Sequence, residues 1–172
     1  MWLFKALAIS LISFALFISG CGFQPLYQYD TASHNILREL SLVRIAPIED
    51  RIGQQLRNFL QDDITPRGKP SNPSYELIVK MNKSRRDLVL LQDATSTFAK
   101  ISLHASYTLT NFDTGGTLAS GNVTAKTGFT ITKSEYANIR AEAEAASRAS
   151  RQISYDITRQ LALFLKKTRS NN

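Results

Sequence analysis

The sequence predicts an α+β fold, a two-layer sandwich in which a four-stranded, mostly antiparallel (mixed) sheet carries two helices on one face, in the order βαβββα. Three observations favour this fold. Long segments in the second half of the chain alternate apolar and polar residues, two further segments repeat apolar residues at helical spacing, and stretches rich in Gly and Pro separate the elements. One apolar sheet face and two apolar helix stripes are all buried when both helices lie on the same side of the sheet.

The first two elements are a strand and a helix. Residues Leu40–Ile48 alternate loosely as far as Pro47, which predicts the strand. Asp50 suits the N-cap of a helix that ends before Pro66. The apolar residues of this helix recur at helical spacing: Ile52, Leu56, Phe59, Leu60 and Ile64. A helical crossover to the next strand makes the two strands parallel if they are neighbours in the sheet.

Three long strands and a second helix complete the domain. The first strand begins at Tyr75 after a Pro-rich loop and is expected to bulge or turn at the basic run Lys83–Arg86. The second, Lys100–Thr110, alternates most regularly, and the turn Asp113–Gly116 joins it to the third as an antiparallel hairpin. From Ser134 the apolar period becomes helical and stays so over about thirty residues.

The N-terminus resembles a secretory signal peptide. Met1–Lys5 contains one positive charge, and the apolar run Ala6–Ile18 is shorter than the roughly 20 residues of a membrane-spanning helix. The following Ser-Gly-Cys, which ends at Cys21, is similar to the lipobox of bacterial lipoproteins and implies cleavage before Cys21 and attachment of lipid to its thiol. The alternative is a buried structural cysteine, although the chain has no second cysteine for a disulfide. Two or three acyl chains would anchor the mature chain stably to a membrane.

These features divide the chain into four parts. Residues 1–20 are the predicted signal peptide, 21–37 a lipidated N-terminal tether, 38–168 a single α+β domain and 169–172 a disordered tail. In the lipoproteins that the lipobox resembles, an Asp after the lipidated cysteine retains the protein in the inner membrane. Gly22 in this place therefore points to the periplasmic side of the outer membrane.

The chain is basic, with 21 Lys and Arg residues against 14 Asp and Glu and a net charge of +7. Such a charge attracts nucleic acid, an anionic membrane or another polyanion. Export from the cytoplasm disfavours nucleic acid, and the chain lacks aromatic and basic residues interleaved on one face. No nucleic-acid partner is therefore expected.

A family resemblance begins at the lipidated cysteine. The run Cys21–Tyr27, Cys-Gly-Phe-Gln-Pro-Leu-Tyr, resembles the opening of the mature LptE lipopolysaccharide-assembly lipoproteins of alphaproteobacteria. The element order and Tyr136-Ala137 at the start of a long Ala- and Arg-rich helix are similar to the family as well. The resemblance covers nearly the whole mature chain, but only its opening run is sharply diagnostic.

The resemblance implies a structural and binding role. Proteins of the LptE family plug the lumen of the outer-membrane β-barrel LptD, help that barrel to assemble and bind lipopolysaccharide on its way to the outer leaflet. The chain is therefore expected to form a heterodimer with LptD, to bind lipopolysaccharide and to need no cofactor. Hydroxyl-rich strand faces suit the polar lumen of a barrel, and they equally suit a solvated sheet.

Lipopolysaccharide carries phosphates and acidic sugars, so its binding needs Lys and Arg. The candidates are the cations of the densest basic run and two near the start of the last helix, where the family has a basic residue: Lys83, Arg85, Arg86, Lys133 and Arg140. At the strand position where the family carries another cation, this chain has Gln92 or Asp93, which is a departure. A merely solvated charged face is the alternative interpretation.

An enzyme is disfavoured, because nucleophilic or metal chemistry needs a thiol, a His cluster or convergent carboxylates. The mature chain has only His34 and His104, and lipid occupies the single thiol. Asp62 and Asp63 are adjacent and so point in different directions on a helix. No catalytic residue and no metal site is expected. The alternative function is a lipid-anchored auxiliary component of another envelope transport system.

Overall fold

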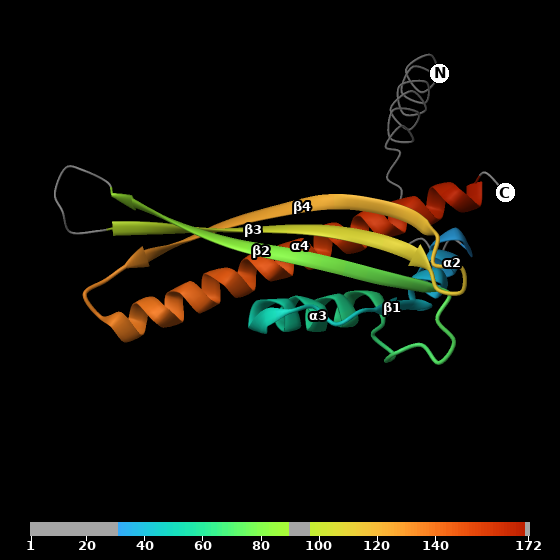
Figure 1. Cartoon of the computed structure of the whole chain (residues 1–172), viewed down its shortest axis with the longest axis horizontal. Helices are drawn as coiled ribbons and strands as arrows, with labels where there is room; N and C mark the ends of the chain where they lie inside the picture. Colours follow the sequence, from blue (N-terminus) through green and yellow to red (C-terminus); the bar gives the residue numbers. More distant parts are fainter. Residues whose placement is uncertain (1–30, 90–96, 171–172) are drawn as a thin grey trace, which may run out of the picture. The chain divides into compact units, whose positions relative to one another are not determined.

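Three long strands and one short strand form the sheet of this protein (Figure 1). The computed structural model describes residues 31–89 and 97–170. The strands are β1 Val43–Ile45, β2 Tyr75–Val89, β3 Thr97–Asn111 and β4 Thr117–Ile131. They follow the order β1-β2-β3-β4, with β1 parallel to β2 and the other pairs antiparallel. The predicted mixed sheet is therefore confirmed.

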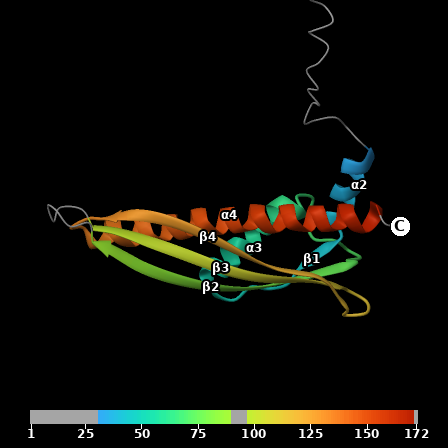
Figure 2. The same ribbon diagram turned by 90° about the horizontal axis from the view of Figure 1, so that it is seen from above.

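In the part of the chain that the structure describes, three helices accompany the sheet: α2 Thr31–Leu40, α3 Asp50–Ile64 and α4 Glu135–Ser170. In Figure 1, α4 runs diagonally across the long strands, and the view in Figure 2 shows it extending along them. It packs on β3 and β4, while α3 packs on α4 and β1. Among the described residues, no helix has both the length and the apolar character needed to cross a membrane.

The core lies between the sheet and the helices. Along β3 the side chains alternate, and Ile101, Leu103 and Leu109 are fully buried. Ile153, Ile157 and Leu161 of α4 are fully buried as well and belong to the same cluster. The side chains of the other sheet face are mostly polar. The strands therefore show the alternation of apolar and polar residues expected of a sheet that is covered on one side. The prediction of two helices on one face is confirmed.

The N-terminal region differs from its prediction. Thr31–Leu40 is the helix α2, although part of it was expected to be an irregular tether. Leu40 is buried, Ile36 packs against the core, and the Tyr75 hydroxyl donates a 3.1 Å hydrogen bond to Glu39 Oε2. These tertiary contacts stabilise a helix that is too short to be stable by itself. The strand expected over Leu40–Ile48 is also shorter, since it pairs only at β1.

Two local predictions on α3 and β2 are wrong. Glu49, not Asp50, is the N-cap residue of α3, and Asp50 has a φ of 66°. The basic run Lys83–Arg86 neither bulges nor turns, because β2 pairs with β3 without a register shift. Side chains of the run continue to alternate between the two faces of the sheet. Lys83 and Arg85, which face the helices, form ion pairs with Glu142 on α4. At the other end, α4 continues through Ser170, beyond the predicted start of the tail.

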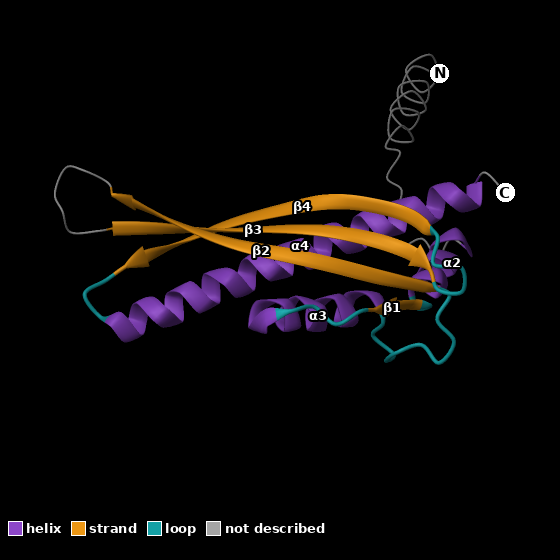
Figure 3. Cartoon of the chain, in the orientation of Figure 1, coloured by secondary structure: helices purple, strands orange, loops and turns teal. Residues whose placement is uncertain are grey.

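Two connections place surface loops at one end of the sheet, drawn in teal in Figure 3. The hairpin between β3 and β4 turns at Asp113–Gly116, as predicted, and Gly115 has the positive φ of 67° that this turn needs. The longer connection, residues 65–74, joins α3 to β2 and contains Pro66, Pro70 and Pro73.

Candidate functional site

The basic run of β2 meets the first turns of α4. Lys83 and Arg85 lie on the helix-facing side of β2, and both reach Glu142. Lys83 Nζ donates a hydrogen bond to Glu142 Oε1, and Arg85 Nη1 donates one to Glu142 Oε2. Both hydrogen bonds have a length of 2.6 Å. One carboxylate therefore joins β2 to α4 and neutralises part of the charge of the run.

Arg85 has two further neighbours. Its Nε donates a 2.8 Å hydrogen bond to Asp87 Oδ1, and its guanidinium carbon lies 5.6 Å from the centroid of the Phe129 ring. The hydrogen bond to Asp87 raises the pKa of Arg85. The hydrogen bond from Lys83, assisted by the charges of Lys83 and Arg85 and opposed by burial, lowers the pKa of Glu142. Each charge stabilises the charged form of its neighbour.

Arg86 belongs to the opposite face of the sheet. The register pairs Arg86 with Lys100, and the next pair on the same face is Leu88 with Phe98. Leu88 is 41% exposed and Phe98 37%. No ion pair between described residues includes Arg86 or Lys100. A pair of cations therefore lies beside a pair of apolar side chains on the uncovered face of the sheet.

Lys133 and Arg140 lie where β4 passes into α4. Both are exposed, and Tyr136 and Ile139 beside them are 75% and 59% exposed. Asn138 fixes this connection, because its side chain accepts a 2.7 Å hydrogen bond from the Thr132 backbone N–H and donates one of 2.9 Å to the Thr132 carbonyl. The start of α4 is thus an ordered element that presents cations and large apolar side chains to solvent.

The uncovered face also contains a shallow depression of about 380 Å³. Its polar lining residues come from three neighbouring strands: Lys80, Asn82, His104, Ser106, Asn122 and Thr124. His104 Nδ1 lies 3.0 Å from Thr124 Oγ1. The depression offers hydroxyl, amide and imidazole groups for hydrogen bonds, together with one cation.

The five predicted cations do not form one cluster. Lys83 and Arg85 meet at Glu142, Arg86 faces away from them, and the remaining two lie at the start of α4. The sequence did not predict the role of Glu142, because the position of α4 beside the sheet decides which of its acidic residues contacts Lys83 and Arg85. It also missed the pairing of Arg86 with Lys100, although strict alternation in both strands was a usable signal. Cys21 and the departure at Gln92 or Asp93 lie outside the described residues.

Comparison with solved structures shows the same fold in other bacterial proteins. A chain described as a lipoprotein from Caulobacter crescentus CB15 is 23% identical, with a TM-score of 0.65 over 78% of this chain and 97% of that one. A homologue of a neuraminyllactose-binding hemagglutinin from Helicobacter pylori is 15% identical, with a TM-score of 0.51 over 76% of this chain and 89% of that one. At these identities the likeness concerns the fold alone. No curated protein matches the chain.

Comparison with protein families gives a specific result. The family model LptE, described as lipopolysaccharide-assembly, matches residues 37–161. The match begins in α2 and ends in α4, so it includes the whole sheet, all of α3 and α4 as far as residue 161. This match over most of the chain shows that the protein belongs to the LptE family of lipopolysaccharide assembly, as its opening residues predicted.

Proposed function

We propose that this protein is an outer-membrane lipoprotein, anchored through Cys21, that binds lipopolysaccharide and forms a heterodimer with the β-barrel LptD as its plug and assembly partner. Family membership gives lipopolysaccharide assembly as its role. The lipid anchor follows from the lipobox-like sequence before Cys21. The barrel partner follows from the resemblance to the family.

One observation on the uncovered sheet face carries the proposal of lipopolysaccharide binding. The cation pair Arg86 and Lys100 lies one step along the strands from the apolar pair Leu88 and Phe98. Lipopolysaccharide has the matching pattern, with phosphates directly beside acyl chains. Arg can bind phosphate through two parallel hydrogen bonds, and neither cation has a carboxylate partner among the described residues.

The geometry ranks the five predicted cations. Glu142 and Asp87 already accept hydrogen bonds from Lys83 and Arg85, so these two cations would have to exchange one anion for another. Arg86 needs no such exchange, nor do Lys133 and Arg140. We therefore assign the main phosphate contact to Arg86 with Lys100, and a further contact to the start of α4.

A binding experiment tests this assignment. Purified full-length protein is titrated with lipopolysaccharide, and the double variant Arg86→Glu/Lys100→Glu is compared with the control Lys166→Glu near the end of α4. We expect the double variant to lose about tenfold or more in affinity, because charge-assisted hydrogen bonds to phosphate are lost. A folded double variant that binds as tightly as the control would refute the assignment.

The barrel partnership needs a separate test. Tagged full-length protein is recovered from detergent-solubilised outer membranes of its host, and mass spectrometry identifies the proteins that accompany it. Stoichiometric recovery of a large outer-membrane barrel supports the LptD heterodimer. Recovery with inner-membrane transporter subunits instead would favour an auxiliary component of another envelope transport system.

A further inference from the structure

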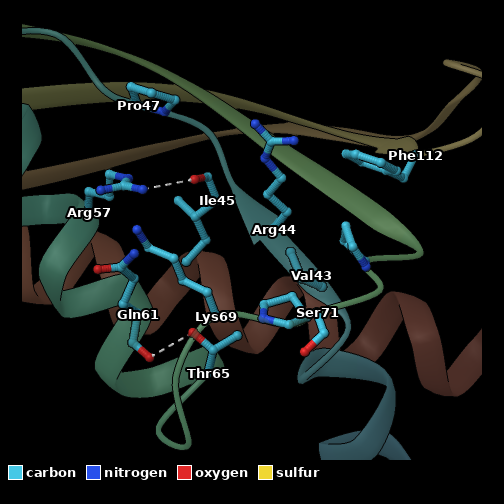
Figure 4. Close-up of a pocket in the computed structure, with 12 residues that line it drawn as sticks. Val43, Arg44, Ile45, Pro47, Arg57, Gln61, Thr65, Lys69, Ser71 and Phe112 are labelled. Carbon is cyan, nitrogen blue, oxygen red and sulfur yellow. Dashed lines mark hydrogen bonds between the residues drawn. The ribbon is translucent and has the colours of Figure 1, made fainter.

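A second cationic site lies beside β1, which is an edge strand of the sheet. A cavity of about 500 Å³ opens between β1, α3 and the Pro-rich loop that follows α3. Figure 4 shows Arg57 and Gln61 reaching it from α3, Lys69 from the loop, and Arg44 lying beside Phe112 on the other side. This volume is within the range of small-molecule sites.

The charges of this cavity are unbalanced. Its lining includes the three cations Arg44, Arg57 and Lys69 but no carboxylate. Arg44 has a partial partner, since its Nε lies 3.7 Å from Glu76 Oε1. Neither Arg57 nor Lys69 takes part in an ion pair with any described residue. The lining therefore has an excess of positive charge.

Arg57 provides a second, independent observation. Its Nη2 donates a long hydrogen bond of 3.4 Å to the Ile45 carbonyl, which holds the guanidinium against the outer edge of β1. Its Nε is buried and has no hydrogen-bond partner among the described residues. Buried donors in proteins are nearly always paired, with protein, water or an ion. Nε therefore lacks the partner that a buried donor usually has, and the side chain to which it belongs lines the cavity.

The remaining lining indicates which ligand would fit. Donors come from three separate elements, β1, α3 and the loop, so they approach from different directions. A tetrahedral phosphate has oxygens pointing in several directions, whereas the two oxygens of a carboxylate lie in one plane. Val43, Ile45, Pro47 and Phe112 add apolar surface to the cavity. Pro70 restricts the backbone directly after Lys69, which limits the positions that the backbone of this residue can take without ligand.

We propose that this cavity is a binding site for a phosphate ester, held by Arg57 and Lys69 with Arg44 at the rim. The ester is either the headgroup of an anionic phospholipid or a free, water-soluble phosphate ester. The site is formed by β1, α3 and the loop, and shares no residue with Arg86, Lys100 or the start of α4. It is therefore independent of the lipopolysaccharide contact proposed above.

The test uses the full-length chain in a nonionic detergent. Inorganic phosphate and glycerol 3-phosphate are titrated by calorimetry, and native mass spectrometry measures the binding of phosphatidylglycerol, with zwitterionic phosphatidylcholine as the control lipid. The variants are Lys69→Gln and Arg57→Gln/Lys69→Gln. The matched control is Arg67→Gln, which removes a cation of the same loop that does not line the cavity.

We expect the double variant to weaken phosphate-ester binding by about tenfold or more, Lys69→Gln by less, and Arg67→Gln not measurably. Binding of glycerol 3-phosphate but not of phosphatidylglycerol identifies a free phosphate ester as the ligand, and binding of phosphatidylglycerol alone identifies a lipid headgroup. Lys69 is exposed, so its single variant is expected to fold even if the Arg57 substitution disturbs the edge of the sheet. Absence of binding to all phosphate probes, or equal losses in Arg67→Gln and Lys69→Gln, would overturn the proposal.

Discussion

Glu142 on α4 accepts a 2.6 Å hydrogen bond from Lys83 on β2, across 59 residues of sequence. The pKa of Glu142 is lowered, chiefly by this hydrogen bond. A carboxyl with a lowered pKa in the folded state stabilises the fold above its unfolded pKa of about 4.3, and this contribution is lost as the pH falls through the folded pKa. We therefore expect Glu142→Gln to destabilise the protein at neutral pH and to lose this effect in acid.

Urea denaturation of wild type and Glu142→Gln, measured from neutral pH to about pH 3, checks this prediction. The two stability curves should converge as Glu142 becomes protonated in the wild type. Glu144→Gln is the control, because Glu144 is an exposed carboxylate of the same helix, 3.6 Å from Arg148. A difference that stays constant over the whole pH range would contradict the proposed role of the Glu142 charge.

Tyr107 connects β3 to α4 in a different way. Its hydroxyl donates a 2.6 Å hydrogen bond to Gln160 Oε1, and its side chain is almost fully buried. Tyr107→Phe keeps the ring and leaves the Gln160 oxygen without this donor. We expect a loss of about 0.5–1.5 kcal/mol in the free energy of unfolding. The control Tyr155→Phe, at a site 62% exposed, should change it much less, and equal effects in chemical denaturation would rule out a specific role of the hydrogen bond.

Leu103 tests which face of the sheet forms the core. It is fully buried on β3, whereas Ile78 on the neighbouring strand lies on the opposite face and is 39% exposed. Leu103→Ala removes apolar contacts and leaves a cavity, so we expect a loss of about 2–5 kcal/mol. Ile78→Ala should cost clearly less in the same thermal or urea unfolding experiment. The reverse order of the two losses would contradict the assignment of the core.

Gly53 allows α3 to approach the segment before it. A Cβ at this position would lie 2.7 Å from Ile48 Cγ2 and 3.2 Å from the Ile48 backbone carbonyl carbon. Alanine in a helix gains about 1 kcal/mol over glycine, but overpacking a buried site costs about 1–3 kcal/mol. We expect overpacking to dominate, so that Gly53→Ala is destabilising overall.

A double-mutant cycle with Ile48→Ala, followed by chemical denaturation, separates these two effects. In the Ile48→Ala background the nearest contact is gone, so Gly53→Ala should cost less than it does in the wild type. If Gly53→Ala stabilises the wild type, steric contact with Ile48 does not limit this position.

Regular patterns in the sequence were sufficient to predict the sheet. The strict alternation of Lys100–Thr110 and the turn at Asp113–Gly116 predicted the β3–β4 hairpin because local interactions determine both. The parallel pairing of β1 with β2 followed from the helical connection between them. Helix α2 was missed because a helix of ten residues depends on tertiary contacts, such as those of Leu40, that no local pattern reveals.

The candidate sites were less predictable than the fold. Composition located the basic run, but it could not show that Glu142 would take up Lys83 and Arg85 while Arg86 faced the other way. Alternation along β2 turns Arg86 away from Lys83 and Arg85, and the position of Glu142 on α4 decides which acid those two reach. The cavity at β1 could not be foreseen either, since Arg44, Arg57 and Lys69 belong to a strand, a helix and a loop, and the crossover from β1 through α3 brings them together.

Helix α4 has a consequence for the order in which the chain can fold. It is the last element in the sequence, and it covers β3 and β4 and also packs against α3. Until its 36 residues are available, the apolar side chains of β3 and β4 lack the helix that packs on them. Burial of that surface provides most of the driving force for folding. The native fold of residues 31–170 can therefore be completed only after synthesis has reached the C-terminal part of the chain.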